Sequence, residues 1–319
     1  MSGDETIGVD LGGTKMLVGV LAGTEVVYEQ REHSTGQTED ELVELLVREV
    51  EEAREARPGV TAVGLGVPAT IDHDRGIAVA AVNLPLTEVP IRELVSERTG
   101  LPVVVDNDAN VAAYAEYLYG AGQGKPYMVM LTVGTGIGGG LVLGGEVYRG
   151  SSGAGAELGH TVIQADGPPC QGSCPNHGCV EALASGTALG REARAAAEAA
   201  PDSALGKALA AGDEVDGRAA TEAALAGDEV AIGVFDLIGS RLGVACATFA
   251  NIFQPDAIVV GGGVIAAGDL LLEPARRELR RRALNPMNRT PILEATLGND
   301  AGMIGAAALA RDELAEAGA

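Results

Sequence analysis

The sequence predicts an α/β fold made of two related domains, and two observations carry this prediction. The first is a pair of similar segments, near residues 7–28 and 127–148, each with a strand, a glycine-rich turn, a second strand, another glycine turn and a third strand. The second is a mixture of helical and strand patterns between and after these segments, which is typical of a partly parallel sheet covered by helices. Together they indicate a duplicated architecture.

Each of the two segments consists of short apolar runs separated by glycines. Such runs predict strands, and the glycines between them predict tight turns. In the first segment the predicted parts are strands at Ile7–Asp10, Met16–Leu21 and Glu25–Tyr28, with turns at Gly12-Gly13 and Ala22-Gly23. In the second they are strands at Tyr127–Val133, Gly139–Leu143 and Glu146–Tyr148, with turns at Gly134–Gly136 and Gly144-Gly145.

Helical and strand patterns fill the rest of the chain. Residues 38–56 have apolar side chains at helical spacing, with Glu and Arg on the other face. The further predicted elements are strands at 62–67, 103–105 and 257–260, helices at 91–99, 111–119 and 305–317, and a helix-rich region at 186–253. We expect an N-terminal α/β domain at 1–118, joined by the last helix at about 303–319, and a larger C-terminal α/β domain at 119–302. The stretch 199–227 has no recognisable chemistry.

The chain is strongly acidic, with 45 Asp and Glu against 22 Lys and Arg and a net charge of −23. Such a surface repels nucleic acid and anionic membranes, so we expect neither as a partner. Concentrated salt would screen the self-repulsion, which suggests a halophilic source; an ordinary acidic bacterial protein is the alternative. Apolar runs stop short of a membrane span and Met1–Thr6 lacks a signal core, so we expect a cytoplasmic enzyme.

Three glycine-rich turns, each beside a predicted strand, have the composition of phosphate-binding loops. They are Asp10-Leu-Gly12-Gly13-Thr14-Lys15, Gly134-Thr135-Gly136 and Gly261-Gly262-Gly263. Glycines allow the backbone to turn its N–H groups towards an anion. Asp10 would repel phosphates unless a metal intervened, so we expect it to hold Mg²⁺ through water. The third turn follows a buried strand, where adenine could lie against the backbone. No Walker loop is present, because the Gly-Lys-Ser/Thr ending is missing.

Polar residues crowd the end of the strand predicted at 103–105. They are Asp106, Asn107, Asp108 and Asn110, at the start of a predicted helix. A helix N-cap would explain one of them, but not all four. Phosphoryl transfer to an alcohol needs a base that accepts the hydroxyl proton, and a carboxylate at a helix N-terminus stays ionised and rigidly placed. This segment is therefore the candidate catalytic region.

A second polar group lies further along the chain. Glu157, His160 and Glu181 offer the acceptors that a ring of sugar hydroxyls requires.

Three cysteines, Cys170, Cys174 and Cys179, fall within ten residues. Cytosolic thiols stay reduced, and three thiolates with one His match a tetrahedral structural zinc site. His160 is the expected fourth ligand, with one ring nitrogen on zinc and the other facing the sugar; His177 is the alternative. Cys246, in an apolar helix, is expected in the core.

The order of these motifs over almost the whole chain resembles the sugar kinases of the ROK family (repressors, open reading frames, kinases) and looks most like its glucokinases. The resemblance implies two duplicated actin-like, ribonuclease H-like ATPase domains with a cleft between them. It also implies transfer of the γ-phosphoryl group of ATP, with Mg²⁺, to the 6-hydroxyl of glucose, and a homodimer.

The resemblance also implies a role for single residues. Asp108 matches the catalytic base of the family's Glu-Asn-Asp-Ala-Asn motif, and Asp106 stands where Glu is usual. The implied sugar contacts are Asn83, Asn107, Asp108, Glu157, His160 and Glu181. The implied nucleotide contacts are Asp10, Gly12, Gly13, Thr14, Lys15, Gly134, Thr135, Gly136, Gly262 and Gly263. The family's cysteine pattern implies zinc on His160, Cys170, Cys174 and Cys179.

Three departures from the family pattern lie near the implied sugar pocket. Ala69 replaces a common Gly, no Trp follows Asn83-Leu-Pro85, and Cys170 and Cys174 are spaced Cys-x-x-x-Cys rather than Cys-x-Cys. The alternatives to glucose are therefore N-acetylmannosamine, fructose or mannose. A sugar-responsive regulator is the rival of another class, but we expect no helix-turn-helix before the first strand.

Overall fold

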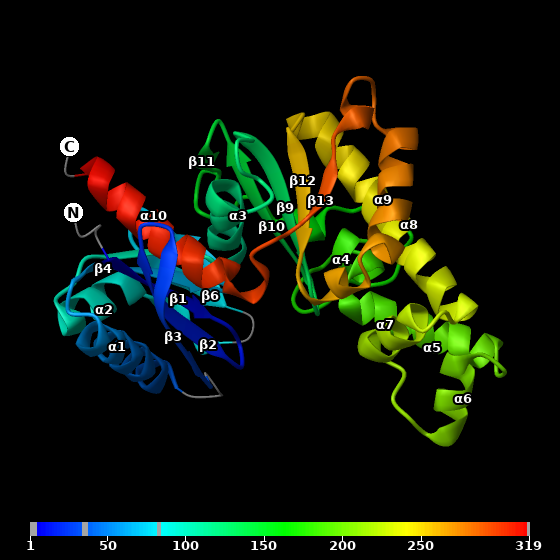
Figure 1. Ribbon diagram of the computed structural model, residues 1–319, viewed down its shortest axis with the longest axis horizontal. Helices are drawn as coiled ribbons and strands as arrows, with labels where there is room; N and C mark the ends of the chain where they lie inside the picture. Colours follow the sequence, from blue (N-terminus) through cyan, green and yellow to red (C-terminus); the bar gives the residue numbers. More distant parts are fainter. Residues whose placement is uncertain (1–4, 34–37, 82–83, 318–319) are drawn as a thin grey trace. The chain divides into compact units, whose positions relative to one another are not determined.

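The computed structural model describes residues 5–33, 38–81 and 84–317, and the chain forms two compact units (Figure 1). Unit 1 consists of Met1–Pro126, Gly140–Ala156 and Leu297–Ala319, and unit 2 of Tyr127–Gly139 and Glu157–Thr296. These units differ from the domains expected from the sequence. Residues 119–126, 140–156 and 297–302, which were expected in the C-terminal domain, belong to unit 1. The division passes through a strand, β10 (Ile137–Leu143).

Unit 1 is built on a five-stranded mixed sheet with the order β3-β2-β1-β4-β8. The strands are β1 (Glu5–Leu11), β2 (Met16–Ala22), β3 (Glu25–Glu32), β4 (Val60–Val67) and β8 (Val103–Asn107). The first three form the predicted antiparallel meander, while β4 and β8 run parallel to β1. A small separate sheet contains β5 (Ala69–Asp72), β6 (Ile77–Ala81) and β7 (Thr87–Val89).

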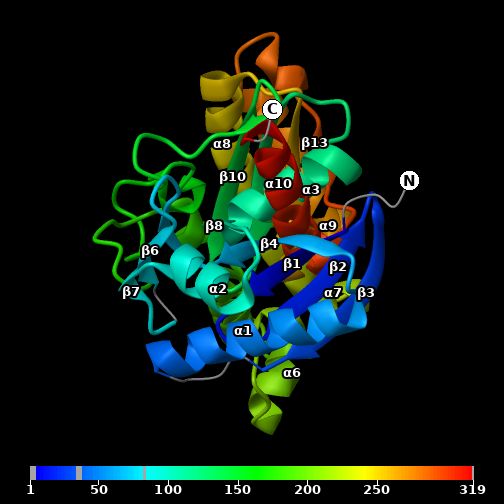
Figure 2. The same cartoon turned by 90° about the vertical axis from the view of Figure 1, so that its left-hand side faces the viewer.

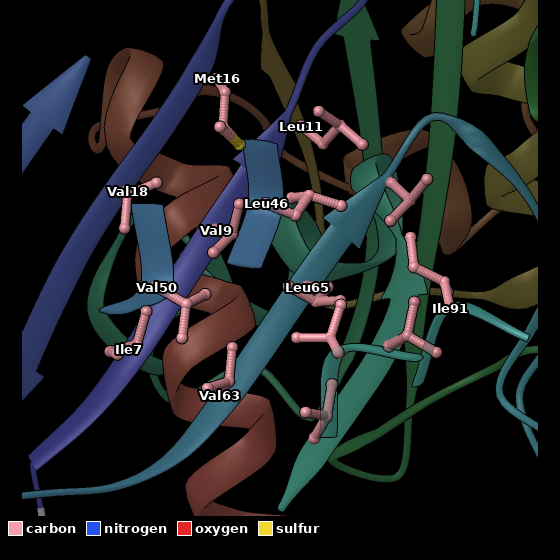
Figure 3. Close-up of a cluster of buried hydrophobic side chains, with 14 of the residues drawn as sticks. Ile7, Val9, Leu11, Met16, Val18, Leu46, Val50, Val63, Leu65 and Ile91 are labelled. Carbon is pink, nitrogen blue, oxygen red and sulfur yellow. The ribbon is translucent and has the colours of Figure 1, made fainter. Parts of the chain in front are cut away.

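Helices cover both faces of the unit 1 sheet. The helices on one face are α1 (Glu39–Ala56) and α2 (Ile91–Thr99), which lie next to each other in Figure 2. Their apolar stripes pack on alternate residues of the strands, such as Ile7 and Val9 of β1 (Figure 3). The other face is covered by α10 (Ala301–Ala317), which also packs against α3 (Asp108–Tyr119).

A row of glycines crosses three strands under α10. Gly8 of β1 pairs with Gly19 of β2 and Gly64 of β4. A Cβ atom at Gly8 would lie 2.0 Å from the carbonyl oxygen of Met303, and one at Gly64 would lie 1.8 Å from that of Ala306. The helix backbone therefore rests directly on the sheet backbone, which only glycine permits.

The second five-stranded sheet repeats the plan of the first, with the order β11-β10-β9-β12-β13. Its strands besides β10 are β9 (Tyr127–Val133), β11 (Glu146–Val147), β12 (Ala257–Gly261) and β13 (Ile292–Glu294). In each sheet, three strands that are consecutive in the sequence lie at one side. Two further strands, which run parallel to the strand beside them, complete the other side. The predicted duplication is confirmed in this shared strand order, as is the α/β fold class.

Helices α4 (Val180–Ala184), α5 (Gly186–Ala199), α6 (Ala204–Ala211), α7 (Gly217–Leu225), α8 (Glu229–Phe253) and α9 (Asp269–Arg282) form the rest of unit 2. Among the described residues, α8 alone has the length and composition to cross a membrane. It packs along α9, however, and Phe235, Cys246 and Phe249 on it are buried. It is a core helix of unit 2, and Cys246 lies in the core as expected.

Candidate active site

The carboxylates of Asp10 and Asp108 interact in unit 1. Asp10 is on β1 and Asp108 is the first residue of α3. Burial, and secondly the negative charge of Asp108, raises the pKa of Asp10 to about 7. A buried carboxylate next to a second negative charge forms a site where a cation is favourable. The arrangement fits the expected Mg²⁺ at Asp10.

The first glycine turn, Gly12–Lys15, joins β1 to β2 directly after Asp10. It closes on itself, because the Gly12 N–H donates to the carbonyl oxygen of Lys15 at 2.8 Å. The N–H of Gly12 is thus engaged within the turn. Thr14 and Lys15 are exposed and carry the side-chain donors of this turn.

The β8–α3 junction orders the polar cluster expected to be catalytic. The strand runs to Asn107 and the helix starts at Asp108, so the predicted strand was too short and the predicted helix began three residues late. Asn107 is the N-cap: its Oδ1 accepts from the N–H groups of Ala109 and Asn110 at 2.9 and 3.3 Å. Its Nδ2 donates to the carbonyl oxygen of Ala69 at 3.2 Å. The side chain of Asn107 thus holds both the start of α3 and the backbone at Ala69.

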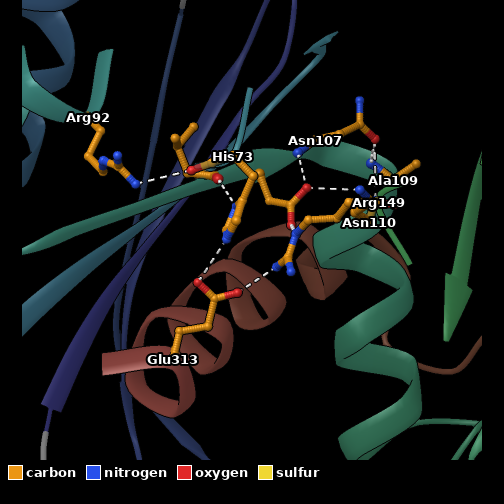
Figure 4. A network of polar contacts seen from close by, with 9 residues as sticks. His73, Arg92, Asn107, Ala109, Asn110, Arg149 and Glu313 are labelled. Carbon is orange, nitrogen blue, oxygen red and sulfur yellow. Dashed lines mark hydrogen bonds and ion pairs between the residues drawn. The ribbon is translucent and has the colours of Figure 1, made fainter. Parts of the chain in front are cut away.

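Asp106 is almost fully buried, with 2% of its surface exposed. Its Oδ1 accepts from the Asn107 N–H and from Asn110 Nδ2, and its Oδ2 accepts from Arg149 Nε at 2.6 Å (Figure 4). Arg149 also pairs with Glu313 of α10, and Glu313 faces His73. Sequence reasoning missed Arg149, Glu313 and His73, because each is a single residue far from any motif.

The second glycine turn, Gly134–Gly136, joins β9 to β10 and is held by its surroundings in unit 2. The Gly134 carbonyl accepts from the Gly186 N–H at 2.7 Å, and the Thr135 carbonyl accepts from Thr187 Oγ1 at 2.8 Å. In a trans peptide the N–H points away from the preceding carbonyl. The N–H groups of Thr135 and Gly136 are therefore turned away from these partners, which suits contact with an anion.

A pocket of about 680 Å³ opens beside the second glycine turn, entirely within unit 2. Gly134, Thr135 and Gly263 line it, as predicted for a nucleotide site. Gly262 has a φ of +88°, and a Cβ there would lie 2.5 Å from the carbonyl oxygen of Val133, so it shapes the turn next to the pocket.

The opposite wall of this pocket comes from a part of the chain in which the sequence offered no chemistry. The lining residues that sequence reasoning missed are Gly186, Thr187, Leu189, Asp216, Gly217, Arg218, Thr221, Glu222, Val264 and Ala266. Several of these residues lie on α7, and Asp216 is the N-cap of that helix. The stretch 199–227, in which the sequence showed no recognisable chemistry, therefore contributes residues to this pocket. An Ala-rich amphipathic helix gives no signal that its polar side lines a pocket.

The predicted zinc ligands meet in unit 2. The ligand atoms of His160, Cys170, Cys174 and Cys179 all lie within 4.8 Å of one another. Cys170 Sγ is 3.5 Å from His160 Nδ1, and Cys174 Sγ is 3.9 Å from Cys179 Sγ. Tetrahedral zinc with Zn–S bonds of about 2.3 Å places neighbouring sulfurs about 3.8 Å apart. The four residues fit a metal, and the altered spacing does not remove Cys170 from the cluster.

His160 lies between the cysteines and Glu157. Its Nδ1 faces the sulfur atoms, while its Nε2 is 4.0 Å from Glu157 Oε2. The alternative ligand, His177, is exposed, and its Nδ1 faces the carbonyl oxygen of Gly167 at 3.2 Å, outside the cluster.

Glu181 connects the cysteine cluster with the second glycine turn. Its Oε2 accepts from the Ile137 N–H at 2.8 Å, just after the turn. Its Oε1 is 3.7 Å from Cys170 Sγ. Glu181 is thus engaged at both oxygens before any sugar binds. Asn83, expected at the sugar, lies outside the described residues.

Comparison with known proteins places these features in a family. The model of the ROK family matches residues 6–313. The chain belongs to the ROK family. It is 38% identical over 312 residues to a glucokinase of Streptomyces coelicolor, an alignment that covers 96% of this chain and 98% of the relative.

Other ROK proteins are similar over most of the chain. A crystal structure of a ROK family glucokinase from Streptomyces griseus in complex with glucose and AMPPNP has a TM-score of 0.83 and 39% identity, covering 97% of this chain and 99% of that one. A putative xylose repressor of Caldicellulosiruptor is 34% identical over 284 residues, which cover 87% of this chain and 70% of the repressor. The family thus includes kinases and regulators, and full-length coverage links this chain to the sugar kinases.

Proposed function

We propose that this protein is an ATP-dependent glucokinase, which transfers the γ-phosphoryl group of ATP to the 6-hydroxyl of glucose. The observation that carries the proposal is the position of Asp108, at the head of α3 and in electrostatic contact with Asp10. Similarity to glucokinases over nearly the full length supports glucose as the sugar.

Asp108 is the general base in this proposal. Its carboxylate accepts the proton of the sugar 6-hydroxyl as that oxygen attacks the γ-phosphorus of ATP. ADP is the leaving group, on the side of the phosphorus opposite the attacking oxygen. The N-terminus of α3 favours the ionised form of Asp108 before the reaction. Mg²⁺, held by Asp10 through water, would neutralise charge on the phosphates.

The two glycine turns and the pocket would hold the nucleotide. Thr135 and Gly136 offer N–H groups to the phosphates, and the resemblance implies further donors at Gly13, Thr14 and Lys15. Adenosine would occupy the 680 Å³ pocket beside Gly263.

The sugar contacts in this proposal are the residues that the family resemblance implies. They are Asn83, Asn107, Asp108, Glu157, His160 and Glu181. His160 Nε2 points away from the cysteines towards Glu157, as a sugar contact by this atom requires. Zinc on the other ring nitrogen and on the three cysteines would fix the ring orientation.

One experiment tests the activity and the sugar together. Purified protein is assayed with ATP and Mg²⁺ against glucose, mannose, fructose and N-acetylmannosamine, in multimolar KCl. We expect the highest kcat/KM with glucose. A higher kcat/KM with another hexose would replace glucose with that sugar, and no turnover with any of them would favour a regulator.

The acidic composition supports a protein adapted to a salty cytoplasm without nucleic-acid or membrane partners. The family resemblance implies that it works as a homodimer. We expect the free energy of unfolding to rise from low to multimolar KCl, because salt screens a net charge of −23. Urea unfolding at each salt concentration measures this. Equal stability in low salt would rule out the halophilic origin.

A further inference from the structure

A chain of polar and charged side chains, buried at Asp106 and Asn110 and half-buried elsewhere, lies next to the catalytic segment of unit 1. We call it the Asp106 network; its members are His73, Asp106, Asn110, Arg149 and Glu313 (Figure 4). They come from five separate parts of unit 1: the β5–β6 turn, β8, α3, the segment 140–156 and α10. The proposed reaction uses none of these side chains.

The network begins at Asp106, whose carboxylate is fully engaged. Oδ1 accepts from the Asn107 N–H at 2.7 Å and from Asn110 Nδ2 at 2.9 Å, on either side of Asp108 in the sequence. Oδ2 accepts from Arg149 Nε at 2.6 Å. One carboxylate thus fixes the residue before Asp108 and the residue two positions after it.

The other contacts of the Asp106 network lead from Arg149 back to β8, the strand that carries Asp106. Arg149 Nη2 donates to Glu313 Oε1 at 2.5 Å, and Glu313 Oε2 is 3.3 Å from His73 Nε2. His73 Nδ1 lies 3.1 Å from the carbonyl oxygen of Val105, the residue next to Asp106. The closed path runs Asp106, Arg149, Glu313, His73 and Val105. A closed path of hydrogen bonds fixes the end of β8 more rigidly than one contact would.

Charge balance supports this arrangement. Asp106 and Glu313 are acidic, Arg149 is basic, and both ring nitrogens of His73 face acceptors, which the protonated imidazole satisfies. Arg92 fixes the position of His73, because its Nη1 donates to the His73 carbonyl at 3.1 Å. Removing Arg149 would leave the buried charge of Asp106 without its partner, which is strongly unfavourable.

We propose that Asp106, Arg149 and Glu313 are positioning residues that set the place of the Asp108 carboxylate without touching the substrate. The inference rests on the proposed role of Asp108 as general base. A base displaced by about 1 Å loses on the order of 100-fold in rate, while substrate binding by other residues continues. The C-terminal helix, through Glu313, thereby takes part in catalysis.

The test compares three isosteric or neutral variants with a surface control. Asp106→Asn, Arg149→Met and Glu313→Gln are assayed for kcat and for glucose affinity by calorimetry. Arg98→Gln on α2 is the control, because Arg98 is exposed in the same unit and its removal changes the net charge as Arg149→Met does. We expect kcat to fall about 10- to 100-fold in the network variants, with the glucose Kd within about threefold of the parent.

A double variant separates a network from independent contacts. If Asp106 and Glu313 act through Arg149, kcat of Asp106→Asn/Glu313→Gln should fall little further than kcat of the worse single variant. Multiplied losses, or a loss in glucose affinity with kcat unchanged, would overturn the proposal. Asp106→Asn keeps size and shape, so it remains informative if Arg149→Met fails to fold.

Asp108→Asn, assayed alongside, separates this inference from the proposed function. If Asp108→Asn keeps full activity, the assignment of the base is wrong. If Asp108→Asn is inactive while the network variants keep the parental kcat, only the positioning role is refuted.

Discussion

The two glycine turns occupy the same place in the two sheets, yet they are stabilised in different ways. The first closes on itself through Gly12 and Lys15, and it follows a buried carboxylate, Asp10. The second also closes on itself, because the Gly134 N–H donates to the Gly136 carbonyl oxygen at 2.9 Å. It has no preceding carboxylate, however, and is held in addition by Gly186, Thr187 and Glu181 from elsewhere in unit 2. The two turns share a backbone plan, and their surroundings give each a different chemistry: a buried carboxylate beside the first, and extra hydrogen bonds to the second.

The largest effect is expected from a substitution of Asp108, near the first glycine turn's carboxylate Asp10. We expect Asp108→Asn to lower kcat by about 1,000-fold, because general-base catalysis contributes roughly 100- to 10,000-fold. Glucose affinity, measured by calorimetry, should be retained, since the amide keeps the shape. Activity near that of the parent would show that Asp108 is not the general base.

Zinc removal tests the contribution of unit 2. We expect Cys174→Ser to hold less than half an equivalent of zinc and to lower the melting temperature by about 5–15 °C, since 1 kcal/mol corresponds to roughly 2–4 °C in a chain of this size. Limited proteolysis should then cut in unit 2 before unit 1. His177→Gln is the control, because this exposed His lies outside the cluster. Full zinc content in Cys174→Ser would contradict the site.

Asp10 allows a test by pH. Its pKa is raised to about 7 in the folded chain from 3.8, so its contribution to stability is complete below about pH 3.8 and is lost as the pH rises through 7. Without Mg²⁺, we expect Asp10→Asn to be more stable than the parent at pH 8 by on the order of 1–3 kcal/mol, with much lower kcat. Mg²⁺ should stabilise the parent more than the variant.

Urea unfolding at pH 5 and pH 8 measures this effect of Asp10. Asp74→Asn, an exposed carboxylate of unit 1, is the control. A stability difference that does not change with pH would show that Asp10 is ionised throughout.

The smallest expected effect concerns the support of the second glycine turn. Thr187→Val removes one hydrogen bond to the Thr135 carbonyl, a net contribution of about 1 kcal/mol, so KM for ATP should rise about fivefold. KM for glucose should stay unchanged. Thr248→Val is the control, because that hydroxyl bonds within its own helix. Equal changes in both KM values would show that the turn serves both substrates.

The sequence predicted most of the elements, because their signals are local. The strand at Tyr127–Val133 and the helix at 91–99 have the predicted boundaries. The junction at Asp106 was placed less well, since polar residues at the end of a strand resemble a loop until their hydrogen bonds are known. The cysteine cluster was predictable because metal ligands of fixed type lie close together in the chain.

The remaining site residues had no such signal. The pocket wall at Asp216 and Thr221 lies on a helix whose composition is that of an ordinary surface helix. Arg149 and Glu313 are charged residues separated by most of unit 2 in the sequence, and only the fold brings them together. Long-range pairs between single common residues cannot be read from one sequence.

The glycine row under α10 has a consequence for the order in which the protein is completed. Residues 301–317 are synthesised long after Gly8 and Gly64, yet their backbone rests on these two glycines. Unit 2 ends at Thr296 and can close earlier during synthesis. Until α10 arrives, the sheet of unit 1 has one uncovered face, and Arg149 lacks Glu313. A nascent chain therefore gains the contact between Arg149 and Glu313 only when translation has passed α10.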